Sequence, residues 1–328
     1  MSEITKRFED ETFDDYFVRL FEHKDEYGLD CQAIADILND ESGEQYGESK
    51  WRKDFRLFNR GRIYERNHSE SGVCKRILSI SDLHIPFQKP IETYRDYVGR
   101  IDILQINGDI CDCTSLSKFT KLYRSSPREE MILARQYLID LIEYLKPKEV
   151  YINYGNHDLR LQTYLAKMLD TDLLELMPQT ALDLICDDGI RHYDKRQRTK
   201  VWYEPLCNVF SSINIKYSGN WFSQIGKVIF CHPLTFKSGI MKTSYDAAVW
   251  FRNEGYDFSA IVMAHTHRMG EYPIGNTLMY EQGACCETKQ MQYSDGKLTL
   301  SQREGFVYLC LDKDGNVLRE NSKLVYLN

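Results

Sequence analysis

Apolar and aromatic residues recur at helical spacing in the first sixty positions of the chain. The first set lies within an acidic stretch and consists of Phe13, Tyr16, Phe17, Leu20 and Phe21. A second apolar run, 33–38, follows Gly28, and a third helical stretch extends from about Ser49 to Asn59, where we expect Gly61 to stop it. This part of the sequence therefore predicts a small all-α, helix-turn-helix-like module.

From Arg76 onward, short apolar runs alternate with helical patterns, and each run ends in a polar cluster. The predicted strands are Ile77–Ile80, Ile101–Ile106, Val150–Tyr154, Val228–Cys231 and Ile261–Ala264. A helix opens at Pro127, and a final hairpin is expected from Phe306–Leu311 and a strand that starts at Val317. This alternation predicts an α/β domain over 73–328, joined to a module over 1–72 by a polar linker from Asn67 to Gly72.

Composition narrows the class of protein. The 328 residues are 42% hydrophobic and 28% charged, which is enough for a packed core. No run approaches the roughly 18 consecutive apolar residues of a membrane span, and the first residues are polar and acidic, so we expect a cytoplasmic protein. The ten cysteines lack the paired spacing of a small secreted scaffold, so we expect reduced thiols and no disulfides.

The net charge of -7 argues against a wholly basic nucleic-acid binder, but the charge is unevenly distributed. The third predicted helix carries the basic residues Lys50, Arg52, Lys53, Arg56 and Arg60. Trp51, Phe55 and Phe58, at spacings of four and three, are expected to bury its opposite face. This pattern is typical of a recognition helix that contacts DNA, although a merely solvated face or a protein contact would have the same pattern.

Asp, Asn and His residues follow the five predicted strands of the large domain. They form the motifs Asp82-Leu83-His84, Gly108-Asp109, Gly155-Asn156-His157-Asp158, His232-Pro233 and His265-Thr266-His267, which contain five of the eight histidines. The carboxyl ends of adjacent strands meet at one edge of an α/β sheet, so these side chains are expected to converge. Imidazole and carboxylate ligands suit Mn, Zn or Fe(II), and a carboxylate beside a glycine, such as Asp109, is suited to bridge two cations.

This ordered set resembles that of the calcineurin-like metallophosphoesterases, including phage and prophage members with an N-terminal helix-turn-helix-like module. The resemblance covers about Ile77 to Gln282 and implies a four-layer β-sandwich flanked by helices. It implies two divalent metal ions, with Mn favoured over Zn, Fe or Ni. The first ion would be held by Asp82, His84, Asp109 and His267, and the second by Asp109, Asn156, His232 and His265.

The resemblance also implies that His157 binds the scissile phosphate and protonates or stabilises the leaving oxygen, with Asp158 orienting its ring. The chain departs from the family at Ala264, where a glycine usually precedes the final H-x-H. Two further features stay open. Asp112 is either a hydrogen-bond partner of a metal-binding histidine or a turn residue, and the basic run from Arg191 to Lys200 is either a solvated loop or a phosphate contact.

The function expected from these features is two-metal hydrolysis of a phosphodiester, with nucleic acid, and DNA in particular, as the substrate. The alternative is a phosphomonoesterase, either a Ser/Thr protein phosphatase or a nucleotide phosphatase, because the same metal core serves both ester types. A DNA-binding adaptor with a degenerate scaffold is disfavoured because all five motifs are intact. The sequence does not indicate the oligomeric state.

Overall fold

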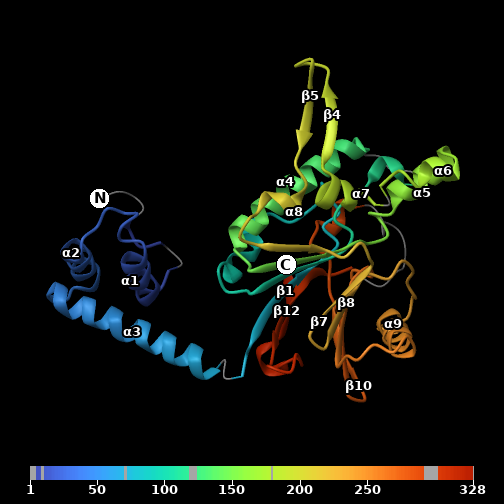
Figure 1. Ribbon diagram of the computed structural model, residues 1–328. Coiled ribbons are helices and arrows are strands. Elements are labelled where there is room, and N and C mark those ends of the chain that lie inside the picture. The colour runs from blue at the N-terminus through green and yellow to red at the C-terminus, as the bar shows by residue number, and fades with distance from the viewer. Residues whose placement is uncertain are drawn as a thin grey trace. The chain divides into compact units, whose positions relative to one another are not determined.

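The computed structural model describes residues 5–8, 11–69, 72–117, 124–178, 180–291 and 302–327. The chain divides into two compact units, Met1–Ser71 and Gly72–Asn328 (Figure 1). Within the described ranges, no helix combines the length and the apolar character needed to cross a membrane.

The N-terminal unit consists of three helices around its own core. They are α1 (Phe13–Glu22), α2 (Cys31–Ser42) and α3 (Glu48–Ser69). The side chains of Thr12 and Asp30 accept hydrogen bonds from the first-turn amides of α1 and α2, which fixes where these helices begin. Leu20, Ile34 and Leu38 are fully buried in the core between the helices.

Helix α3 is longer than the sequence analysis predicts. It continues through Gly61 to Ser69, so the predicted stop is wrong and the predicted linker begins inside the helix. A single interior glycine costs only about 1 kcal/mol relative to alanine, which the flanking helix-forming residues tolerate. Trp51 is buried and Phe55 partly buried as expected, but Phe58 is 41% exposed and does not belong to the core.

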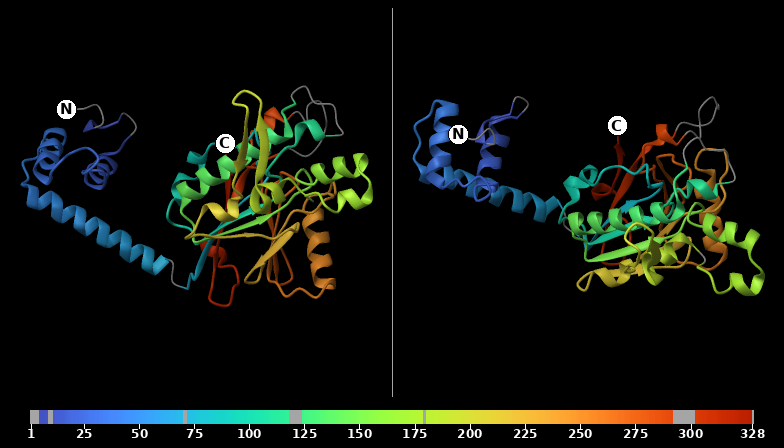
Figure 2. Two further views of the ribbon diagram at one scale, coloured as in Figure 1. Left: turned by 45° about the horizontal axis from the view of Figure 1, so that its top comes forward. Right: turned by 90° about the horizontal axis from the view of Figure 1, so that it is seen from above.

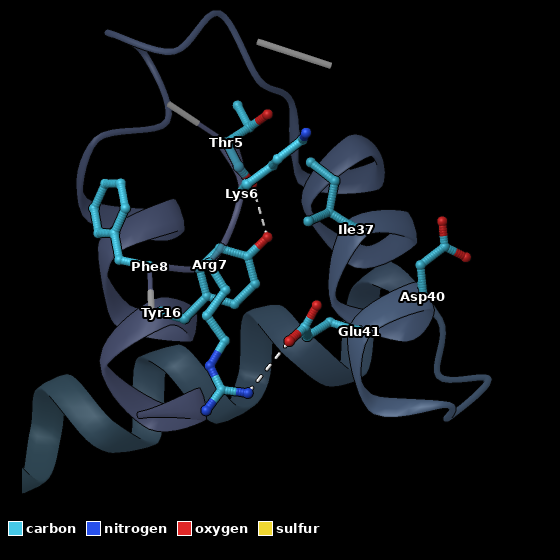
Figure 3. Close-up of a pocket in the computed structure, with 8 residues that line it drawn as sticks. All are labelled: Thr5, Lys6, Arg7, Phe8, Tyr16, Ile37, Asp40 and Glu41. Carbon is cyan, nitrogen blue, oxygen red and sulfur yellow. Dashed lines mark hydrogen bonds and ion pairs between the residues drawn. The ribbon is translucent and has the colours of Figure 1, made fainter. Parts of the chain in front are cut away.

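A pocket of about 530 Å³ lies between the N-terminal segment and helices α1 and α2 (Figure 3). Arg7 forms an ion pair with Glu41 across it, and the Tyr16 hydroxyl donates to the Thr5 carbonyl at 2.7 Å. None of the five basic residues expected to contact DNA lines this pocket.

The large unit contains a six-stranded sheet in the order β13-β12-β1-β2-β3-β6. Its strands are β1 (Lys75–Ile80), β2 (Ile103–Asn107), β3 (Glu149–Asn153), β6 (Asn214–Tyr217), β12 (Glu304–Leu311) and β13 (Lys323–Leu327). Strands β1, β2, β3 and β6 run parallel, whereas β12 is antiparallel to β1 and to β13.

A second sheet of five strands has the order β10-β11-β9-β8-β7. Its strands are β7 (Phe222–Ile225), β8 (Val228–Cys231), β9 (Ala260–Met263), β10 (Gly270–Ile274) and β11 (Thr277–Glu281). Strands β8, β9 and β11 run parallel to one another, so β8 and β9 end at the same edge.

Successive residues of a strand point to opposite faces, and the burial of each strand follows from this rule. Ile77 of β1 packs with Phe230 and Val262 of the second sheet, whereas Leu78 packs on the other side with the helical layer. Ile261 of β9 faces outward against α9. The two sheets therefore lie face to face between helices, and Figure 1 shows α4 (green) and α9 (orange) on opposite sides of them.

The helices of the large unit occupy the connections between strands. They are α4 (Pro127–Leu145), α5 (Arg160–Met168), α6 (Thr171–Leu174), α7 (Ala181–Asp183), α8 (Leu206–Val209) and α9 (Lys242–Asn253), with short helical turns η2 (Ile91–Tyr97), η3 (Thr114–Leu116), η4 (Leu184–Asp188), η5 (Thr288–Gln290) and η6 (Arg319–Asn321). The predicted α/β class with an all-helical N-terminal part is confirmed.

Two local predictions are revised. The basic run from Arg191 to Lys200 is not a loop but part of a hairpin formed by β4 (Ile190–Asp194) and β5 (Thr199–Tyr203). The chain does turn after Leu311, but Val317 makes only an isolated bridge, and the returning strand β13 starts at Lys323. All ten cysteines are free thiols, as predicted.

Candidate metal centre

The five motifs lie in the loops at the carboxyl ends of β1, β2, β3, β8 and β9. Short backbone hydrogen bonds hold these loops together. The amide of His84 donates to the Asp109 carbonyl at 3.0 Å, and the amide of His265 donates to Oδ2 of Asp82 at 3.3 Å. The second of these bonds joins a loop of the five-stranded sheet to a loop of the six-stranded sheet.

Two buried asparagines join the sheets directly beneath the loops. The Nδ2 of Asn107 donates to the carbonyls of Cys231 and Val262 at 3.1 and 3.3 Å. The Nδ2 of Asn153 donates to Oδ1 of Asn107 at 3.0 Å and to the carbonyl of Phe230 at 3.1 Å. These bonds fix one half of the site relative to the other.

The loops have an unusual backbone conformation, because several residues other than glycine adopt positive φ angles. The predicted metal ligands among them are Asp82 (51°), His84 (44°), Asp109 (51°), His265 (82°) and His267 (52°). Such residues cost free energy and concentrate at functional sites, where the surrounding fold imposes them.

The first predicted ligand group is brought together. The Nε2 atoms of His84 and His267 are 3.1 Å apart, and Nε2 of His267 lies 3.0 Å from Oδ1 of Asp82. Oδ2 of Asp109 lies 3.7 Å from Nε2 of His84. All four side chains are buried.

The second group is also brought together, around the same carboxylate oxygen. Nε2 of His232 lies 3.4 Å from Oδ2 of Asp109 and 3.3 Å from Oδ1 of Asn156. The other ring nitrogen of His232 donates to the carbonyl of Asn107 at 2.9 Å, which turns Nε2 toward the cluster. The ring of His265 lies 5.2 Å from that of His232. Asp109 therefore stands between the two groups, as predicted for a bridging ligand.

The glycines of the motifs are required by close packing between side chains. A Cβ on Gly108, whose φ is +83°, would lie 2.5 Å from Nδ1 of His232. A Cβ on Gly155 would overlap the carboxylate of Asp109. Ala264, where the family usually has glycine, needs no special conformation, and its amide donates to the Cys231 carbonyl at 3.0 Å.

The donor atoms fit a divalent cation. Nε2 of His265 and Nδ1 of His267 are buried and have no hydrogen-bond partner among the described residues. Buried polar atoms are normally paired, so unpaired ring nitrogens beside a buried carboxylate are expected where a metal ion completes the site. The arrangement of Asp82, His84 and His267, and that of Asp109, His232 and His265, brings one ligand atom from each residue within 4.8 Å of the others.

Burial and neighbouring charges act in opposite directions on the ionisable groups here. Burial raises the pKa of Asp109, but the rings of His232 and His157 outweigh it and hold that pKa well below its usual range. Burial lowers the pKa of His232, but the charge of Asp109 raises it to about 9. The bridging carboxylate therefore needs no proton loss to take up a cation at neutral pH, whereas His232 releases a proton when it becomes a ligand.

Asp112, left open by the sequence, contacts both His84 and His157. Its Oδ1 lies 3.2 Å from Nδ1 of His84 and 2.9 Å from Nδ1 of His157. The role of ring orientation expected for Asp158 is therefore wrong. The carboxylate of Asp158 accepts the backbone amides of Gly155 and Cys111 at 2.9 and 3.1 Å, and so holds two site loops together. Burial, followed by the charge of Asp109, raises the pKa of Asp158 to about 7.

Sequence reasoning missed Arg160. Its Nη1 donates to the Asp112 carbonyl at 2.6 Å, and its Nη2 lies 2.9 Å from Nε2 of His157. The available signal was a cation three positions after His157 at the start of a helix, a spacing that brings two side chains to one face. Nε2 of His157 also lies 3.9 Å from Oδ2 of Asp109, so this pair faces the bridging position.

The five basic residues predicted to contact nucleic acid lie on α3 and are exposed. Lys50 forms an ion pair with Asp54, and Arg52 pairs with Glu48 at 3.0 Å. The other four of the five, Arg52, Lys53, Arg56 and Arg60, line a groove of about 690 Å³ together with Lys24.

Residues 75–269 match the family model described as calcineurin-like phosphoesterase, and residues 2–70 match that of the YonJ N-terminal domain. The SPbeta prophage-derived uncharacterized protein YonJ of Bacillus subtilis (strain 168) is 39% identical over 66 residues. That match covers 20% of this chain, and the chain spans only 16% of the length of that relative.

Solved structures are similar over the large unit at low sequence identity. A metallophosphoesterase from Sphaerobacter thermophilus is 15% identical, with a TM-score of 0.37 over 77% of this chain and 88% of the other. Vps29 from Entamoeba histolytica complexed with Zn²⁺ is 14% identical, with a TM-score of 0.35 over 77% and 98% of the two chains.

Proposed function

Because the chain belongs to the calcineurin-like phosphoesterase family and is a metal-dependent phosphoesterase, we propose that its substrate is the phosphodiester backbone of nucleic acid. The observation that supports this choice is the cation-lined groove of the N-terminal unit. We also propose Mn as the metal, since the donor set of imidazole, carboxylate and amide oxygen suits it.

The metal ligands follow from the two clusters. Asp82, His84 and His267 would hold one ion, Asn156, His232 and His265 the other, and Asp109 would contribute to both. A bound metal pair supplies Lewis acidity toward the phosphoryl oxygens and lowers the pKa of coordinated water.

The chain's own residues position the phosphate. His157 and Arg160 present ring and guanidinium nitrogens on the side of Asp109 where Nε2 of His157 lies. Asp112 holds the opposite nitrogen of His157 and so fixes the ring. In this arrangement Arg160 places positive charge where the transferred phosphoryl group and the leaving oxygen gain negative charge, and His157 orients that oxygen.

The N-terminal unit would recruit the polymer. Five cations, Lys24, Arg52, Lys53, Arg56 and Arg60, line its groove, and the groove holds no carboxylate. A row of cations beside a helix suits contact with successive phosphates, which gives affinity without a requirement for base sequence.

The test uses the full chain with Mn and four substrates: single-stranded DNA, duplex DNA, bis-p-nitrophenyl phosphate and p-nitrophenyl phosphate. We expect cleavage of DNA and of the small diester. Hydrolysis of p-nitrophenyl phosphate alone would contradict the proposal and favour a phosphomonoesterase.

The groove is tested by a triple variant, Arg52→Glu, Lys53→Glu and Arg56→Glu. DNA affinity and its salt dependence should fall, while hydrolysis of bis-p-nitrophenyl phosphate stays unchanged, because each lost phosphate contact removes about one counterion from the equilibrium. The matched control reverses three exposed cations of the large unit, Arg95, Lys313 and Lys323, and should leave DNA affinity nearly unaltered. Equal losses in both variants would show that the groove has no special role.

A further inference from the structure

The hairpin of β4 and β5 is a feature that the metal centre does not use. Among the described residues its two strands pair only with each other. Figures 1 and 2 show it in yellow, extending away from the rest of the large unit. Its root is fixed, because Ile190 is buried in the main core and Tyr203 packs against that core.

The hairpin has two different faces. The register places Arg191 opposite Trp202 and Tyr193 opposite Lys200, and these four side chains share one face. All four are exposed, with Tyr193 at 55% and Trp202 at 54%. The guanidinium of Arg191 lies 5.7 Å from the ring centroid of Trp202. Two large aromatic rings and two cations are thus presented together to solvent.

The charge of the hairpin contrasts with that of the chain. Its cations are Arg191, Lys195, Arg196, Arg198 and Lys200, within a protein of net charge -7. In the part of the chain that the structure describes, none of them forms an ion pair. The only carboxylate, Asp194, accepts the backbone amides of Arg196 and Gln197 at 2.7 and 3.1 Å, so it fixes the turn.

We propose that this face binds a single-stranded segment of nucleic acid. Bases would stack on Tyr193 and Trp202, and Lys195, Arg196 and Arg198 at the tip would contact phosphates. Stacking requires bases with free faces, which a single strand offers and an intact duplex does not. The proposal deepens the proposed function, on which it rests for the choice of nucleic acid as substrate.

The hairpin is connected to the catalytic loop through its root. The amide of Ala181 donates to the carbonyl of Asp158 at 3.1 Å, and the chain then passes through α7 and η4 directly into β4. A strand held on the hairpin is therefore bound to the same rigid unit that carries the metal ligands.

The experiment measures binding by fluorescence anisotropy, using the full chain with Asp109→Asn to prevent cleavage. The probes are a labelled ten-nucleotide single strand and a duplex of the same sequence. The double variant Tyr193→Ala and Trp202→Ala should weaken single-strand binding about tenfold or more, because each lost stacking ring removes a base contact. Duplex binding should change little.

The controls separate stacking from folding and from general hydrophobicity. Tyr272→Ala with Tyr326→Ala removes two equally exposed rings, at 54% and 55%, and should have no effect. Tyr193→Phe with Trp202→Phe keeps both rings and should retain most of the affinity. Replacing Lys195, Arg196 and Arg198 by Ser should lower the salt dependence of single-strand binding by about 0.7 per lost contact.

Unchanged single-strand affinity in the alanine double variant would overturn the proposal, as would equal losses for duplex and single strand. The proposed function is read separately, from DNA cleavage with Asp109 intact. Binding of single strands through the hairpin without any cleavage of DNA would refute the nuclease and leave the hairpin site standing.

Discussion

Gly108 shows at the scale of one residue how little space the metal centre allows. We expect Gly108→Ala to lose metal and activity, because the added Cβ would displace the ring of His232. Gly255→Ala is the matched control, since Gly255 has the same φ of +83° but nothing within 4 Å of the added atom. The control should cost only the roughly 1–2 kcal/mol of a left-handed alanine.

Elemental analysis of bound metal and urea unfolding distinguish the two glycine variants. Gly108→Ala should bind less metal and lose more stability than Gly255→Ala. Equal metal content in both would mean that His232 can move aside and that its position is not essential.

Asp112 gives a second prediction at this scale. Asp112→Asn should lower turnover or metal affinity by roughly 10–100-fold, because the carboxylate orients two histidine rings that face the ligand cluster. Asp96→Asn, at a side chain that is 81% exposed, is the control. Turnover and metal content equal to those of the control would reduce Asp112 to a turn residue.

The sequence predicted individual residues well where strand ends determine their place. All seven expected metal ligands converge, because each directly follows a strand and parallel strands end together. It failed for Asp158, since adjacency to His157 in sequence does not set where a side chain points. The contacts of Asp112 and Arg160 to His157 depend on loop geometry, which spacing alone does not specify.

At the scale of elements, α3 offers a test of the helix that the sequence expected to stop. Gly61→Ala should stabilise the N-terminal unit by about 1 kcal/mol, because Gly61 lies in the helix interior with nothing within 4 Å of an added Cβ. Gly43→Ala should destabilise it, since Gly43 caps α2 with a φ of +73°. Urea unfolding followed by circular dichroism checks both, and a destabilising Gly61→Ala would show that the helix does not continue through this position.

The strands that the sequence missed are those whose pattern is obscured by charge or by short length. In β4 and β5 the inward positions, such as Ile190 and Tyr203, alternate with cations, so the run resembles a solvated loop. Strands β6 and β7 have four residues each, too few to establish a period. The helix α4, with nineteen residues and one continuous apolar face, begins at Pro127 as expected.

At the scale of the whole molecule, the two units have separate cores, so metal should affect them differently. Removal of metal should abolish hydrolysis and lower the melting temperature of the large unit by several degrees, because a ligand at 100 times its Kd contributes about 2.7 kcal/mol. The transition of the N-terminal unit should not shift. Calorimetry with and without chelator measures both effects.

Re-addition of Mn is the control and should restore both the activity and the higher melting temperature. Full activity after exhaustive removal, verified by elemental analysis, would contradict two-metal catalysis.

The joining of two sheets at the metal centre also has a consequence for how long the native state persists. His84 and His267 are 183 positions apart in sequence, yet their ring nitrogens approach to 3.1 Å. Contacts of such long range form late, after the chain has paid the entropy of closing large loops. Interactions absent from the transition state slow unfolding and leave folding nearly unaffected. A metal pair held between the sheets would therefore lengthen the lifetime of the native state without hastening its formation.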